Sequence, residues 1–109
     1  MSEENNNLSV QSANYRLPSE TTLLHAAKLS IVEDKPIMLD YWTASLQKDH
    51  DKTKCLIGIR NKTEKMLVKS EDEYTSPIKK FYKNDKDFIV VTENSIYIIS
   101  ADVQTRMIS

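Results

Sequence analysis

Glycine is almost absent from this chain of 109 residues, with Gly58 as its single occurrence. Phosphate-binding loops and dinucleotide fingerprints need several glycines, because the backbone must approach the phosphates closely. Nucleotide-dependent catalysis of these two types is therefore excluded. Gly58 itself lies inside an apolar segment, where a lone glycine indicates a bulge, a sharp bend or the close approach of another backbone.

Cysteine and histidine are also scarce: Cys55 is the only cysteine, and His25 and His50 are the only histidines. A single cysteine cannot form an intramolecular disulfide, and no C-x-x-C or H-x-x-x-H spacing offers the closely placed ligands that zinc requires. We therefore expect no metal and no cofactor. A lone thiol fits a reducing compartment, so the expected localisation is intracellular, in the cytoplasm or in a virion if the protein is viral.

Long apolar runs and an excess of either charge are missing as well. The longest apolar runs have four residues, at 88–91 and 96–99, and the N-terminus lacks the features of a signal peptide, so we expect no membrane segment. The 15 basic and 16 acidic residues give a formal net charge of −1. No global field attracts nucleic acid or an anionic membrane, and any electrostatic partner must be bound locally.

The strongest positive signal is the segment 88–100, in which two runs of β-branched and aromatic residues flank Glu93-Asn94. This pattern predicts a β-hairpin with a two-residue loop. The predicted alternation gives one face with Ile89, Val91, Ile96 and Ile98, and another with Phe88, Val90, Tyr97 and Ile99. Both faces are apolar, so a helix, a second sheet or another chain must cover each of them.

The N-terminal third predicts a tail and a helix. Residues 1–17 are rich in Asn, Ser and Glu and predict a disordered tail. Ser19 is a suitable N-cap for a helix that runs to about residue 33 and ends at the break in residues 34–36. Its apolar stripe, which we expect to face the core, consists of Leu23, Leu24, Ala27 and Ile31.

The remaining segments predict strands. Residues 37–46 are ambiguous between a second helix and a strand, and the alternation of their apolar residues favours the strand. Residues 47–54 read as a charged connector, 55–59 and 65–69 as a second hairpin, and 78–83 as a short strand.

The expected fold class is therefore α+β, with one N-terminal amphipathic helix followed by a mostly antiparallel small sheet or curved barrel of about six strands. It forms a single domain over residues 18–103, and residues 104–109 are expected to fray.

The leading functional hypothesis is a non-enzymatic structural or protein-interaction module, because the apolar sheet faces exceed what one helix can cover. Such a module would self-associate or dock on a protein partner through its sheet. The candidate partner-binding residues are Phe88, Val90, Tyr97 and Ile99. An accessory component of a viral particle is one form of this hypothesis, suggested by a composition rich in Lys, Asn and Ile.

A second hypothesis is a nucleic-acid-associated β-barrel module, because residues 79–83 interleave basic and aromatic side chains. The candidate nucleic-acid-binding residues are Lys79, Lys80, Tyr82 and Lys83. Acidic residues on both sides cancel much of the local charge, and lysines that protect an edge strand predict the same pattern. We therefore rank nucleic acid below protein as the partner.

A third hypothesis is a small enzyme built around Asp40 or His50. Asp40 precedes Tyr41 and Trp42, a setting that can raise the pKa of a carboxyl group, and Cys55 follows His50 closely in the chain. A second carboxylate or a third orienting group is not recognisable in the sequence. The sequence therefore predicts no catalytic, cofactor-binding or metal-binding residues.

Overall fold

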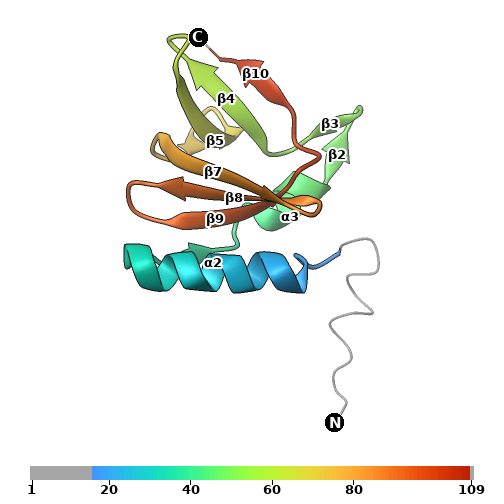
Figure 1. The fold of residues 1–109 in the computed structure, drawn as a ribbon. Helices are drawn as coiled ribbons and strands as arrows, with labels where there is room; N and C mark the ends of the chain where they lie inside the picture. Colours follow the sequence, from blue (N-terminus) through green and yellow to red (C-terminus); the bar gives the residue numbers. More distant parts are fainter. Residues whose placement is uncertain (1–15, 109) are drawn as a thin grey trace.

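The computed structural model describes residues 16–108, and the predicted hairpin lies at its centre (Figure 1). β8 (Asp87–Thr92) and β9 (Ile96–Ser100) pair antiparallel, with Val91 opposite Ile96 and Ile89 opposite Ile98. The Thr92 amide donates a hydrogen bond to the Ser95 carbonyl at 2.9 Å, which closes the turn. The predicted register is confirmed.

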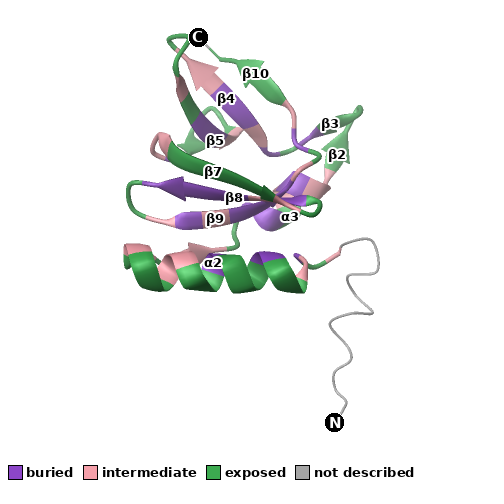
Figure 2. Ribbon diagram, in the orientation of Figure 1, coloured by how far each residue is buried: buried purple, intermediate pink, exposed green. Residues whose placement is uncertain are grey.

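The hairpin is the middle of a four-stranded sheet, here called the first sheet. Its strand order is β1 (Ile37–Met38), β9, β8, β7 (Ile78–Asn84), with β1 parallel to β9 and the other pairs antiparallel. β7 is therefore an edge strand, and Figure 2 shows it mostly exposed while β8 and β9 are mostly buried.

A second four-stranded sheet has the order β10 (Thr105–Met107), β4 (Leu56–Arg60), β5 (Glu64–Ser70), β6 (Glu73–Tyr74). The predicted hairpin of β4 and β5 is confirmed. The expected fraying of residues 104–109 is wrong for its central part, because β10 pairs with β4 in parallel.

The charged connector also differs from the prediction, since it contains a small hairpin of β2 (Lys48–Asp49) and β3 (Lys52–Thr53). Its turn residues His50 and Asp51 take positive φ angles of 53° and 69°.

The α+β class is confirmed, but residues 16–108 form ten strands rather than about six, and neither four-stranded sheet closes into a barrel. The additional strands are two or three residues long, too short to leave a pattern in the sequence.

The predicted helix is α2 (Glu20–Glu33). The Ser19 side chain accepts a hydrogen bond from the Thr22 amide, and Asp34 ends the helix in the left-handed conformation at φ 56°. Both boundaries follow from local chemistry that the sequence displays, namely an N-cap serine and a helix-breaking segment before Pro36.

The face that α2 buries is not the predicted one. Thr22 and Ala26 are fully buried against the first sheet, whereas Leu24 is 62% exposed and Ile31 is 81% exposed. Polar contacts hold the helix in this rotation: the Asn84 side-chain amide donates to Thr22 Oγ1 at 3.0 Å. The small Thr22 and Ala26 side chains also allow the helix backbone to approach the sheet closely.

At the other end of the helix, Lys80 Nζ lies 2.7 Å from Glu33 Oε2. The helix is therefore tied to β7 near both of its ends. Together these contacts fix which side of α2 faces solvent.

The ambiguous segment 37–46 is part strand and part helix. Only Ile37 and Met38 form the predicted strand, and α3 (Trp42–Leu46) follows. Tyr41 and Trp42 are adjacent in sequence but enter two different cores. The Trp42 ring nitrogen donates to the Arg16 carbonyl at 2.9 Å, which satisfies its polar group.

The two apolar faces of the hairpin support two cores. One core lies between the first sheet and the helices and consists of Ala26, Trp42, Ile89, Val91, Ile96 and Ile98. The other lies between the two sheets and includes Tyr41, Cys55, Ile57, Leu67, Val90 and Ile99. The expectation that a cover is needed on both faces is confirmed, and the chain itself supplies both covers.

Gly58 lies in the middle of β4 with an ordinary extended backbone. A Cβ atom at this position would lie 2.9 Å from Ile108 Cδ1 and 3.0 Å from Val68 Cγ2. The glycine therefore makes room for these two side chains. The sequence had suggested a bulge, a sharp bend or the close approach of another backbone instead.

In residues 16–108, no helix is long and apolar enough to cross a membrane.

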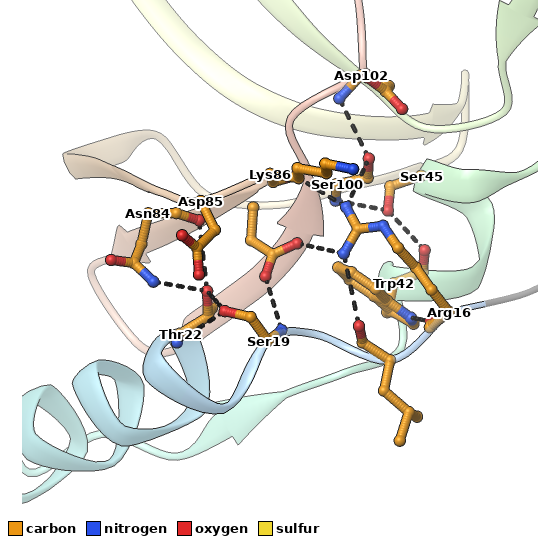
Figure 3. A network of polar contacts seen from close by, with 12 residues as sticks. Arg16, Ser19, Thr22, Trp42, Ser45, Asn84, Asp85, Lys86, Ser100 and Asp102 are labelled. Atoms are coloured by element: carbon orange, nitrogen blue, oxygen red, sulfur yellow. Dashed lines mark hydrogen bonds and ion pairs between the residues drawn. The ribbon is translucent and has the colours of Figure 1, made fainter.

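The start of α2 is joined to the β7–β8 turn by a polar network (Figure 3). The Asp87 side chain is fully buried, and it accepts hydrogen bonds from Arg16 at 2.7 Å and from the Ser19 amide at 2.9 Å. Arg16 also donates to the Lys86 carbonyl at 2.8 Å, and its guanidinium lies 5.0 Å from the Trp42 ring centroid. The predicted tail of residues 1–17 thus ends too late, since Arg16 belongs to the fold; residues 1–15 lie outside the described residues.

We expect Ile98→Asp to unfold the protein, because Ile98 is 0% exposed and a carboxylate in an apolar core costs about 4 kcal/mol or more. Circular dichroism during thermal unfolding measures this. Ile31→Asp is the matched control, because Ile31 is 81% exposed and its variant should keep the parent melting temperature. Equal melting temperatures for Ile98→Asp and the parent would contradict the burial of this face.

We expect Asp87→Asn to lower the free energy of unfolding by about 2 kcal/mol, because a buried, charge-assisted contact with Arg16 is lost. Urea unfolding monitored by Trp42 fluorescence measures this. Asp85→Asn, in the exposed turn between β7 and β8, is the control and should have a smaller effect. A larger loss for Asp85→Asn than for Asp87→Asn would show that the buried pair does not hold the helix.

Candidate functional site

The four predicted partner-binding residues lie within the chain's own core. Val90 and Ile99 are 0% exposed between the two sheets. Phe88 and Tyr97 are half-buried at the edge of the same core. The Tyr97 ring meets Tyr41 edge-on, with the centroids 5.3 Å apart. These residues therefore form the contact between the sheets rather than a free binding face.

The four predicted nucleic-acid-binding residues all lie on β7 but do not act as one set. Lys80 is paired with Glu33, and their hydrogen bond lowers the pKa of Glu33 and raises that of Lys80. Lys79 and Lys83 are exposed, and Tyr82 is 41% exposed. Between them, Phe81 packs on Phe88 with ring centroids 4.5 Å apart. Strand alternation separates Phe81 from Tyr82, so β7 offers no shared platform for stacking bases.

A groove of about 350 Å³ runs between α2 and β7, and it is here called the edge groove. Its apolar wall is formed by Leu29, Val32, Tyr82 and Ile89. Its basic groups are His25, Lys28 and Lys83, and none of the lining residues is acidic. The groove lies beside the edge strand, whose outer side pairs with no other strand of the described chain.

The outer face of α2 adds exposed apolar surface next to the edge groove. Besides Leu24 and Ile31, Val32 is 77% exposed and Leu23 is 39% exposed. A helix that is apolar on both its inner and outer sides is typical of a helix covered on both sides. Sequence analysis identified Leu23, Leu24 and Ile31 as part of a stripe but assigned that stripe to the core, because it had no information on the rotation set by the contacts of Asn84 and Glu33. Val32 was not part of the predicted stripe.

The residues considered for catalysis do not come together as one group in the structure. Asp40 is exposed after β1, and His50 lies in the exposed β2–β3 turn with Nε2 3.5 Å from Asp49 Oδ1. Cys55 is 0% exposed, and burial raises the pKa of its thiol to about 12. In residues 16–108, no three His, Cys, Asp or Glu side chains are grouped so that they could share a metal ion.

Comparisons with known proteins give no relative: no family model, no curated protein and no solved structure matches this chain.

We expect Cys55 to resist alkylation in the folded protein. Its pKa of about 12 leaves the thiol protonated at pH 8, and the thiolate is the reactive species. Iodoacetamide labelling with mass detection, with and without urea, measures the reactivity. Rapid labelling without urea would contradict the buried thiol.

The same pKa shift makes the stability of the fold depend on pH. In the unfolded chain the Cys55 thiol has its ordinary pKa near 9.0, so the unfolded state loses the thiol proton first. The free energy of unfolding therefore falls as pH rises from about 9 to 12.

Proposed function

We propose that this chain is a non-enzymatic protein-interaction module that binds an extended, acidic and partly apolar segment of a partner along β7 and the edge groove. The observation that carries the proposal is an open edge strand beside a groove with an apolar wall and only basic charges. The sheet therefore takes part through its edge, not through the buried faces of its hairpin.

Backbone groups support this mode of binding. An edge strand has unpaired N–H and C=O groups on its outer side, and an added strand can hydrogen-bond to them. β7 has seven residues, enough for a partner strand of ordinary length. Apolar side chains of the added strand on one face could then contact Leu29 and Val32 in the edge groove.

Charge favours an acidic partner over a second copy of β7. The strand carries Lys79, Lys80 and Lys83, so two copies paired edge to edge would bring lysines together. A partner with carboxylates would meet Lys28 and Lys83 instead. These contacts would mainly set specificity and the rate of association, while apolar burial would supply most of the affinity.

A random peptide library displayed on phage tests the proposal with the purified chain. We expect enrichment of sequences that alternate Asp or Glu with Val, Ile or Leu. Val32→Glu, which places a carboxylate in the edge groove, should weaken the selected peptides by about tenfold. Ile31→Glu is the matched control, because Ile31 is 81% exposed on the same helix, close to the 77% of Val32, but does not line the groove.

Two outcomes would overturn the proposal. The edge groove is excluded if Val32→Glu and Ile31→Glu have the same effect on peptide binding. Nucleic acid replaces protein as the partner if the chain selects no peptides but binds a ten-nucleotide single strand at physiological salt, with loss of binding in Lys79→Glu and Lys83→Glu.

A further inference from the structure

A second apolar hollow adjoins β7, between the two sheets, and it is here called the sheet pocket. It measures about 220 Å³. A cavity of about 150 Å³ already holds a benzene ring, so the sheet pocket has room for one apolar side chain. Its apolar lining consists of Ile57, Ile78, Phe81, Phe88 and Val103, and its other lining residues are Lys65 and Thr105.

The edge groove and the sheet pocket lie on opposite faces of β7. Tyr82, which lines the edge groove, pairs with Ile89 of the core beneath the helices. Phe81, which lines the sheet pocket, pairs with Val90 of the core between the sheets. Directly paired residues of an antiparallel ladder share a face, and successive residues alternate between faces. β7 therefore has an apolar hollow on each side.

Phe81 leaves apolar surface uncovered at the sheet pocket. Its ring packs on Phe88, yet the residue is 42% exposed, whereas its strand partner Val90 is 0% exposed. The core between the sheets is thus covered at Val90 but not at Phe81, which lies on the strand whose outer edge is unpaired in the described chain. A strand added to that edge would place side chains over this uncovered surface.

We propose that the partner segment is apolar on both faces, with one apolar side chain in the edge groove and a second in the sheet pocket. This inference rests on the proposed function and specifies what the partner presents. Because side chains of an added strand alternate between faces, the two apolar residues are separated by an odd number of positions. In residues 16–108, neither hollow is lined by an acidic residue, so the charge of both suits a segment with carboxylates at its other positions.

A peptide scan with the purified full chain tests the inference. The base peptide has ten residues that alternate Glu with Val, so its valines share one face and its glutamates the other. Each Glu is replaced in turn by Leu and, as the matched control that removes the same charge, by Ser. At one position we expect Leu to bind about tenfold more tightly than Ser, because the leucine side chain is buried in the sheet pocket. Fluorescence anisotropy measures the dissociation constants.

Three variants of the chain show whether this gain comes from the sheet pocket. Thr105 is exposed and lines the pocket, so the carboxylate of Thr105→Glu should cancel the gain of Leu over Ser. Thr63→Glu is the matched control and should keep the gain, because Thr63 is exposed in the β4–β5 turn and lines neither hollow. Phe81→Ala removes an aromatic wall of the pocket and should also reduce the gain. Melting temperatures of all three variants are measured in parallel.

The outcomes separate this inference from the proposed function. The inference is overturned, while the function stands, if Val32→Glu weakens binding of the base peptide but Leu and Ser bind equally at every position. Equal gains of Leu over Ser in Thr105→Glu and Thr63→Glu would also overturn it. If neither the base peptide nor any Leu peptide binds at millimolar concentration, the proposed function fails and the inference fails with it.

Discussion

The constraint on which the structure depends is that β8 and β9 are apolar on both faces. An antiparallel ribbon usually turns one face to water, but here Ile89 and Ile98 line one side while Val90 and Ile99 line the other. The hairpin must therefore lie between two covers. The chain meets this requirement with α2 and α3 on one face and the second sheet on the other, so the three layers follow from the composition of two strands.

Polar contacts determine how the helical layer is placed. Asn84 and Lys80 hold opposite ends of α2 against β7, and Asp87 holds the residues before the helix. These contacts select the face with Thr22 and Ala26 for burial, although the stripe with Leu24 and Ile31 is more apolar. Burial of that stripe would release more apolar surface from water. Burying the stripe would also separate the polar groups that now pair. In the observed rotation, the apolar stripe therefore stays exposed to solvent and is available for contact.

The features that the sequence predicted correctly are those with short-range causes. The register of residues 88–100 follows from alternation about Glu93-Asn94, and the bounds of α2 follow from Ser19 and the break before Pro36. The parallel pairings of β1 with β9 and of β10 with β4 join segments far apart in the chain and were missed. The same limit applies to the edge groove. It combines Lys28 with Lys83, which are far apart in the sequence, so it does not exist before the chain has folded.

The position of the central hairpin along the chain has a consequence for biosynthesis. α2 ends at Glu33, but the hairpin that supplies most of its apolar core begins at Asp87, so 54 further residues must be made before the helix can meet that hairpin. At about 5–20 residues per second, a nascent chain would carry α2 without its partner for about 3–10 s. During this interval the helix would expose both of its apolar sides, and an isolated helix of 14 residues is only marginally stable in water. The helix can therefore not reach its buried position before residues 87–100 have been made.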